Sequence, residues 1–296
     1  MLARLSFLLV AAGAAVAAPI SQAAITGTKY FFVFGDSYTS SGFNINGAKP
    51  SASNPMGNPP LPGNTQSGGL TWAGFLASQL NTSLTLTFNF AVAGATVDNS
   101  IVQAYMSSVP SIADQVKTWT SNLQSKPSYA PWTAENALFG VFIGVNDVGN
   151  SFTQSGEAAR LNKDLDRYFS LLGTLYAGGA RNFALLSIPP TNKTPQMKSN
   201  AKVADLVTAI VQWNDELPTR VAAFKTASPE ANFTIVDTSP PWETALANPK
   251  AYGAPDATCT NSNGKSCLWF NSYHPGVAIQ KLVAQAVATA FNGTFF

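Results

Sequence analysis

The feature that most constrains the fold is an alternation between short apolar runs and longer segments whose apolar residues recur every three or four positions. The apolar runs cover residues 30–34, 86–92, 137–143, 183–188 and 233–236. The helical patterns cover residues 72–80, 112–123, 158–176, 203–224 and 277–291. Short continuous apolar runs are typical of parallel strands that are buried on both faces. The alternation therefore predicts an α/β chain folded as a three-layer α/β/α sandwich around a parallel sheet of about five strands.

Two segments interrupt this rhythm. Residues 44–69 are dominated by Asn, Pro, Gly and Ser, and Lys49 is their only charged residue. A loop of this length is usually functional or disordered, and its place directly after the first predicted strand favours a wall of an active site. Residues 240–269 are expected to form a second irregular excursion. Neither an internal repeat nor a linker divides the rest, so we expect residues 18–296 to form one domain.

The amino terminus has the pattern of a secretory signal peptide. Arg4 precedes an apolar run over residues 5–17, and Ala15-Val16-Ala17 fits an A-x-A cleavage site. The run is shorter than the roughly 20 residues that span a bilayer, which argues against an anchor helix. We therefore expect residues 1–17 to be removed and the protein to be secreted; cleavage after Ala23 is the alternative.

Secretion has two covalent consequences. In an oxidising compartment the only two cysteines, Cys259 and Cys267, are expected to form a disulfide. Asn-x-Ser/Thr sequons make a eukaryotic secreted form a candidate glycoprotein. The candidate acceptors are Asn81, Asn192, Asn232 and Asn292.

The charge and the metal-binding residue types limit the function. Charged residues make up 11% of the chain and the formal net charge is +2, without basic runs, which argues against a nucleic-acid partner. One histidine and two cysteines cannot build a Cys/His zinc site. We expect no metal, no cofactor and no membrane partner.

Ligands of open parallel sheets bind at the carboxyl ends of the strands, so the residues that follow the apolar runs are the first functional candidates. The first run ends in Gly35-Asp36-Ser37-Tyr38, where Ser37 is either an exposed nucleophile or an ordinary helix cap. Gly94 follows the second run, where bare backbone can approach a ligand. Asn146 follows the third and either donates a hydrogen bond into the same crevice or forms a turn.

His274, in Asn271-Ser272-Tyr273-His274-Pro275, is the only histidine of the chain. A solitary histidine is more often structural than catalytic. It lies just before the last predicted helix, and in a serine hydrolase it has no competitor as general base.

These four blocks, in this order, resemble the SGNH (GDSL-type) hydrolase family over essentially the whole mature chain. The resemblance implies a flavodoxin-like α/β/α fold and ester hydrolysis. It assigns Ser37 as the nucleophile, His274 as the base, and Gly94, Asn146 and the Ser37 amide as oxyanion-hole donors. The long loop leading into Trp72-Ala73-Gly74-Phe75-Leu76 is most similar to fungal acetyl esterases of carbohydrate esterase family 16.

One position departs from the family pattern. The aspartate that usually stands three residues before the histidine is replaced by Asn271, and an amide does not stabilise an imidazolium as a carboxylate does. Either the enzyme works with a Ser37–His274 dyad that Asn271 orients, or another carboxylate completes a triad, with Asp256 as the candidate. The chain lacks the Gly-x-Ser-x-Gly motif of α/β-hydrolases, which disfavours that fold.

The predicted function is a secreted serine esterase that removes acetyl groups from hemicellulose-derived oligosaccharides or other small esters. Four aromatic residues either border an open cleft or belong to the core: Trp72, Trp242, Trp269 and Tyr273. A lipid acyl hydrolase of the same fold is one alternative, but the sequence has no amphipathic lid helix rich in Leu and Phe. A non-catalytic cell-wall or carbohydrate-binding protein is the other, and Asn271 alone favours it.

Overall fold

The computed structural model describes residues 27–296, so the predicted signal peptide lies outside the described residues. A parallel sheet forms the centre, with the strand order β2-β1-β3-β4-β5. Its strands are β1 (Lys29–Gly35), β2 (Thr85–Asn89), β3 (Ala137–Phe142), β4 (Asn182–Leu186) and β5 (Asn232–Val236). This is the flavodoxin-like order, in which β1 and β3 flank the point where the winding of the sheet reverses.

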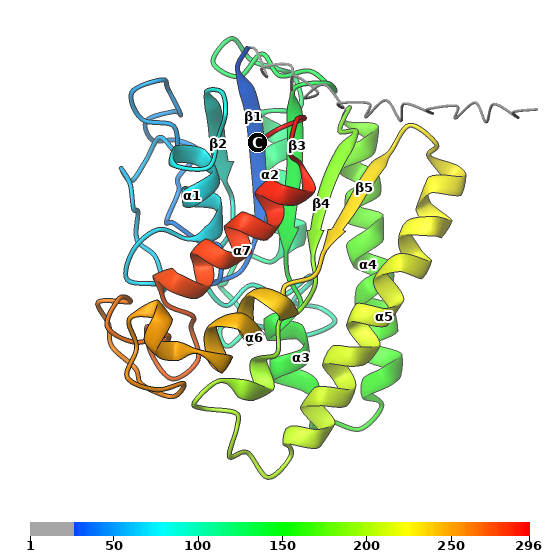
Figure 1. The fold of residues 1–296 in the computed structure, drawn as a ribbon. Helices are drawn as coiled ribbons and strands as arrows, with labels where there is room; N and C mark the ends of the chain where they lie inside the picture. The colour runs from blue at the N-terminus through cyan, green and yellow to red at the C-terminus, as the bar shows by residue number, and fades with distance from the viewer. Residues whose placement is uncertain (1–26) are drawn as a thin grey trace, which may run out of the picture.

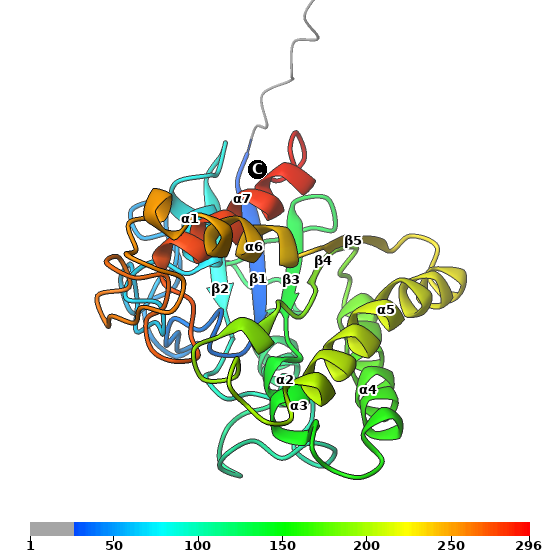
Figure 2. The same cartoon turned by 60° about the horizontal axis from the view of Figure 1, so that its bottom comes forward.

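The sheet lies between two layers of helices, as predicted (Figures 1 and 2). One face is covered by α1 (Trp72–Ser78), α6 (Ser239–Ala247) and α7 (Val277–Ala290). The other is covered by α2 (Ile112–Asn122), α4 (Glu157–Ala177) and α5 (Val203–Ala227). The short helix α3 (Val145–Ser151) lies beyond the carboxyl end of β3, and two 3₁₀ turns cover Thr191–Lys193 and Pro249–Tyr252.

The three central strands are apolar because both of their faces are covered. Every residue of β3 is buried, as is every residue of β1 after Lys29. Phe32 of β1 packs against Phe139 of the neighbouring β3 and against Trp119 of α2. Burial on both faces removes the period-two alternation of a half-exposed strand, which is why these strands appear as continuous apolar runs.

Two helices were not predicted. The expected irregular segment 240–269 begins with α6, whose Pro240 and Pro241 lie in the first helical turn. Proline is tolerated there because those backbone N–H groups have no partner within the helix. The Gly-x-Asn-Asp block likewise opens α3 rather than forming a simple turn. The remainder of 240–269 is largely irregular, as expected.

Three of the four aromatic residues considered for an open cleft are core residues. Trp72, Trp242 and Trp269 are fully buried, and only Tyr273 is partly exposed. Across residues 27–296, every helix is too short or too polar to cross a membrane.

Candidate active site

The carboxyl edge of the sheet brings the four predicted blocks together. Ser37 follows β1, Gly94 follows β2, Asn146 lies in the first turn of α3 after β3, and His274 precedes α7. In Figure 1 this edge is the lower end of the strands, where the arrows point. Ser37 and His274, 237 residues apart in the chain, meet there with the Ser37 Oγ 2.8 Å from the His274 Nε2.

Ser37 lies in a tight turn and not at the start of a helix. The backbone amides of Thr39 and Ser40 donate to the carbonyl of Asp36, at 3.1 and 2.9 Å. The alternative that Ser37 is an ordinary helix cap is therefore wrong. Gly35 is required just before the turn, because a Cβ there would lie 2.4 Å from the carbonyl oxygen of Phe142. Only a glycine lets the end of β1 approach β3 this closely.

Asn271 determines which nitrogen of His274 carries the proton. Its Oδ1 accepts hydrogen bonds from the backbone amides of Tyr273 and His274, both at 2.9 Å, so the side-chain oxygen must occupy this position. The same oxygen lies 2.9 Å from the His274 Nδ1. An acceptor at that point requires an N–H on Nδ1, which leaves Nε2 free to accept the proton of Ser37. Asn271 thereby selects the tautomer that a general base needs.

The environment of His274 keeps the ring neutral. Burial lowers the pKa of His274 to about 4, because a charged ring would lose solvation. The buried ring of Tyr38 packs edge-to-face against it, with the centroids 5.7 Å apart. The Tyr38 hydroxyl donates to the Tyr273 carbonyl at 2.8 Å and so ties the Ser37 turn to the loop that carries His274.

Asp256 does not contact His274, so its candidacy as third member of a triad was wrong. Its Oδ1 accepts hydrogen bonds from the Thr258 hydroxyl and from the backbone amides of Thr258 and Cys259, at 2.7 to 2.9 Å. These bonds lower the pKa of Asp256 below its usual value. The carboxylate stabilises the turn before the disulfide instead.

The three groups expected to donate to an oxyanion have hydrogen-bonding capacity left over. Gly94 has a φ of +83°, which favours glycine. Within residues 27–296 the backbone amides of Ser37 and Gly94 donate to no protein acceptor. Asn146 uses one proton of its Nδ2 in a 2.9 Å bond to the carbonyl of Ala95 and keeps the other. The bond to Ala95 fixes the Asn146 side chain against the Gly94 loop.

Three buried side-chain amides, which the sequence analysis missed, hold the turn around Ser37 in place. Gln115 of α2 clamps Gly35 with two bonds, one to its amide at 3.0 Å and one to its carbonyl at 2.9 Å. Asn89 at the end of β2 donates to the carbonyl of Thr39 at 2.7 Å. Gln280 of α7 donates to the carbonyl of Tyr38 at 3.0 Å. The turn is therefore fixed from the sheet and from both helical layers.

A pair of buried acids, Asp147 and Asp164, lies behind the segment that follows Gly94. The Asp147 carboxylate accepts from the Val97 amide at 2.8 Å, which anchors the segment after Gly94 to α3. Both oxygens of the buried Asp164 carboxyl group on α4, and the Oδ2 of Asp147, have no hydrogen-bond partner among residues 27–296. A buried carboxyl group without donors is destabilised in its charged form. Burial, followed by the charge of Asp147, raises the pKa of Asp164 to about 11, and burial raises the pKa of Asp147 as well.

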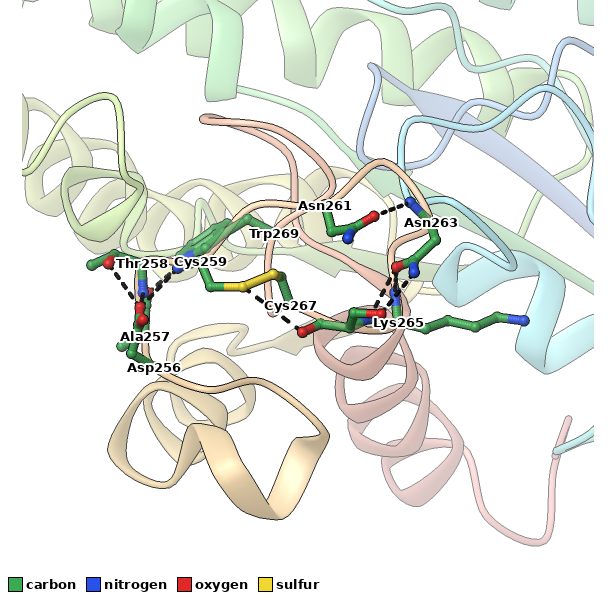
Figure 3. The surroundings of a disulfide bond; sticks show 10 residues. Asp256, Ala257, Thr258, Cys259, Asn261, Asn263, Lys265, Cys267 and Trp269 are labelled. Atoms are coloured by element: carbon green, nitrogen blue, oxygen red, sulfur yellow. Dashed lines mark hydrogen bonds between the residues drawn. A yellow bond between two sulfur atoms is a disulfide. The ribbon is translucent and has the colours of Figure 1, made fainter.

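The predicted disulfide joins Cys259 to Cys267 (Figure 3). Cys267 is buried, and the next two residues, Leu268 and Trp269, enter the core. The Trp269 indole N–H donates to the Ala257 carbonyl at 2.8 Å, bracing the disulfide loop from inside. The chain then returns to the site through a bond from the Phe270 amide to the His274 carbonyl at 2.9 Å.

The long loop 44–69 packs between two segments that lead to the site. The Asn64 amide donates to the carbonyl of Ser41, four residues after Ser37, at 2.8 Å. A Cβ on Gly68 would lie 2.5 Å from the backbone of Asn263 and Gly264, which places the loop against the disulfide segment. Among the described residues, no group of three or more His, Cys, Asp or Glu side chains is arranged to hold a metal ion.

The glycosylation candidates differ in accessibility. Asn232 and Asn292 are exposed, whereas Asn81 and Asn192 are half-buried. The Asn81 Nδ2, to which a glycan would be attached, donates to the carbonyl of Ser83 at 2.8 Å.

Comparison with known proteins shows which family the chain matches. Residues 31–287 match the family of GDSL-like lipases/acylhydrolases. The chain is 52% identical to an acetylesterase of Thermothelomyces thermophilus over 294 residues, 98% of this chain and 96% of the relative. It is 31% identical to an acetylesterase of Hypocrea jecorina over 169 residues, 54% of this chain and 47% of that relative.

A crystal structure of an acetylxylan esterase from Geobacillus stearothermophilus has the same fold. Its TM-score is 0.51 at 14% identity, over 88% of this chain and 93% of that one. The strand order, the match over most of the chain and the near full-length relative agree with the resemblance found in the sequence. The chain belongs to the GDSL-like lipase/acylhydrolase family and has the SGNH hydrolase fold.

Proposed function

We propose that this protein is a secreted serine esterase that removes acetyl groups from carbohydrates through an acyl-enzyme on Ser37. The observation that carries the proposal is the 2.8 Å contact between the Ser37 Oγ and the His274 Nε2, with Nδ1 of the same ring held by the Asn271 oxygen. An acetylesterase 52% identical over nearly the full chain supports the acetyl group as the acyl part.

The reaction has two steps. His274 accepts the Ser37 proton at Nε2 while Oγ attacks the ester carbonyl, and the oxyanion is held by the amides of Ser37 and Gly94 and by the Asn146 side chain. The C–O bond to the sugar then breaks, and the proton on Nε2 passes to the leaving sugar oxygen. A water molecule, deprotonated by His274, then attacks the acetyl-Ser37 ester. The bond between the acetyl carbon and Oγ breaks, acetate leaves, and the proton on Nε2 returns to the Ser37 Oγ. Losing one oxyanion donor typically lowers turnover by about 100-fold to 1,000-fold.

Asn271 orients the ring of His274 as an aspartate would, but it carries no negative charge. The imidazolium formed in each step is less stabilised than beside an aspartate, but the tautomer is correct. In the serine-protease template, changing Asp to Asn costs roughly 10⁴ in turnover because the wrong tautomer results. Here two backbone amides hold the asparagine oxygen towards the ring, which prevents that outcome.

Acetate release from acetylated xylo-oligosaccharides, compared with hydrolysis of a decanoyl ester, tests the substrate class. Burial of an acyl chain contributes about 0.8 kcal/mol per CH₂ only where an apolar channel exists. We expect acetate release, with kcat/KM falling steeply from acetyl to butyryl and longer esters. Ser37→Ala is the control for contaminating esterases. Equal or higher efficiency on the decanoyl ester would reassign the protein as a lipid acyl hydrolase, and inactivity on every ester would favour a binding protein.

The proposal includes the mature form. Residues 1–17 act as the signal peptide, residues 18–296 form one catalytic domain, and the exposed Asn232 and Asn292 are the acceptors that a eukaryotic host glycosylates first. Amino-terminal sequencing and glycopeptide mass spectrometry of the protein recovered from culture medium test both points. A mature protein that still begins at residue 1 would contradict the leader.

A further inference from the structure

We propose that Tyr105 is a binding platform for the sugar ring that carries the acetyl group. The inference rests on the proposed function and adds the residue that selects carbohydrate over other esters. Tyr105 lies in the loop between β2 and α2, outside the residues that perform the chemistry.

The ring of Tyr105 lies directly against the oxyanion side of the site. A Cβ added to Gly94 would be 2.3 Å from the Tyr105 Cε1 and 2.6 Å from its Cδ1. The ring thus covers one side of the glycine whose amide is a proposed oxyanion donor. A sugar whose acetyl carbonyl binds at that amide has the alkoxy side of its ester within reach of the Tyr105 ring.

The tyrosine remains in solvent despite this contact. Its exposed fraction is 68%, and that of the next residue, Met106, is 51%. Five large hydrophobic side chains among residues 27–296 are exposed, and Tyr105 and Met106 are the two most exposed of them. An exposed aromatic residue beside a catalytic centre has apolar surface available for a ligand.

The loop that carries Tyr105 is fixed on both sides. The Asn99 side chain donates to the Val109 carbonyl at 2.8 Å and accepts from the Ala104 amide at 3.0 Å. The Asn150 side chain of α3 donates to the Gln103 carbonyl at 3.2 Å. Ala104, directly before Tyr105, is buried. These bonds fix the backbone of the loop and keep Tyr105 in its exposed position. A loop that is already ordered loses less conformational entropy when a ligand binds.

The chemistry of this surface suits a sugar better than an acyl chain. A pyranose ring presents C–H groups on its faces and hydroxyls around its rim, so it matches an aromatic face surrounded by polar groups. The exposed Gln103, Ser107 and Ser108 supply such groups around Tyr105 and Met106. A long acyl chain needs a groove that removes most of its surface from water, and two exposed side chains on an open loop do not enclose one.

Kinetics with two acetyl esters test the platform. One substrate is an acetylated xylo-oligosaccharide, and the other is ethyl acetate, which has no ring to stack. Tyr105→Ala should lower the ratio of kcat/KM for the oligosaccharide to that for ethyl acetate by about threefold to tenfold, mainly through KM, the effect of losing one aromatic contact. Tyr105→Phe should keep the wild-type ratio. Tyr129→Ala, which removes another exposed tyrosine at the opposite end of α2, is the matched control and should leave both rates unchanged.

The contrary outcomes are distinguishable. An unchanged ratio in Tyr105→Ala, or an equal loss on both esters, overturns the platform and leaves the carbohydrate esterase intact. A loss confined to a decanoyl ester would make the surface an acyl site and overturn the proposal. Wild-type enzyme that cleaves ethyl acetate but releases no acetate from the oligosaccharide overturns the carbohydrate function and the platform with it.

Discussion

Asn271 holds the position at which a carboxylate would stand beside the histidine, and its oxygen makes three contacts at once. It accepts from two backbone amides and faces Nδ1 of His274. The first two contacts shape the loop, and the third sets the tautomer. In the proposed mechanism, Asn271 therefore orients the base but supplies no charge to stabilise the imidazolium.

Variants at Asn271 separate these roles. Asn271→Ala removes the acceptor at Nδ1 and should lower turnover about tenfold, or about 1.4 kcal/mol. Asn271→Asp keeps every contact and adds a charge that stabilises the imidazolium, so the pKa of His274 should rise from about 4. Because activity is lost as pH falls through this pKa, the acidic limb of the kcat/KM profile should move to higher pH. Plateau turnover should be kept or raised. The pH–rate profiles of the three proteins measure this.

Asp256→Asn is the matched control and should keep wild-type turnover, because among residues 27–296 Asp256 accepts hydrogen bonds only from Thr258 and Cys259. A loss near a thousandfold in Asp256→Asn, with Asn271→Ala almost unaffected, would overturn the dyad. An unmoved acidic limb in Asn271→Asp would mean that the histidine does not set that limb.

The sequence could predict which residues lie at the carboxyl edge of the sheet, but not the buried polar side chains that hold them there. The placement of Ser37, Gly94, Asn146 and His274 was predictable because each lies next to a strand or helix whose pattern is visible. Gln115 and the other amide clamps lie within helical or strand patterns, where an amide resembles any polar residue until its backbone partner is known. Asp256 was chosen by nearness in sequence, which does not report which way a turn directs its carboxylate.

At the scale of elements, the segment from the disulfide to α7 delivers His274 to the end of β1. The disulfide closes a loop with a sequence separation of only 8 residues. The buried Trp269 and the hydrogen bond from the Gly276 amide to the Leu268 carbonyl attach the segment to the core. A closed loop this small removes little entropy from the unfolded chain. The disulfide therefore serves the position of the loop more than the stability of the fold.

The double variant Cys259→Ser/Cys267→Ser should lose more activity than stability. We expect a global loss at or below about 3 kcal/mol, the value for a loop of about fifteen residues. kcat/KM for ethyl acetate should fall because His274 is placed less accurately. Urea unfolding and steady-state kinetics on the same preparation give the two numbers. Unchanged kinetics with a large fall in stability would show that the bond serves the fold and not the site.

The central strands were predictable because strands buried on both faces consist almost entirely of apolar residues, which gives a continuous apolar run in the sequence. The helices α3 and α6 were not, because each is short and begins with residues typical of turns. Helix α3 starts with Val145-Asn146-Asp147, and α6 starts with Ser239-Pro240-Pro241. Such short helices are stabilised by packing against the rest of the fold, and these contacts are not visible in the local sequence.

At the scale of the whole molecule, three buried acids make the fold sensitive to alkali. Burial raises the pKa of Asp36 to about 8, against the opposing hydrogen bond from the Tyr38 amide. Asp164, at about 11, and Asp147 are raised as well. A raised pKa means that the folded state holds a proton that the unfolded state releases above about pH 4. Each such group stabilises the fold at low pH and loses that contribution as pH rises through its folded pKa.

We expect the free energy of unfolding to decrease from pH 6.5 to pH 8. His274 does not alter this window: its lowered pKa costs stability only between its ordinary value of 6.5 and about 4, as pH falls. Asp164→Asn mimics the protonated acid and should flatten the decrease, because one of the groups no longer titrates. Urea unfolding at several pH values measures both slopes. Stability that rises with pH across this window would show that the buried acids are ionised in the folded protein.

Covalent capture of Ser37 tests the central claim most directly. An organophosphonate should react once with the wild-type enzyme and leave its adduct on the peptide that contains Ser37, as read by mass spectrometry. Ser37→Ala should be folded, take no adduct and lose activity by about 10⁴-fold or more, the scale on which removing a nucleophile acts. A Ser37→Ala protein with wild-type esterase activity, or an adduct on another residue, would contradict the assignment of Ser37 as the nucleophile.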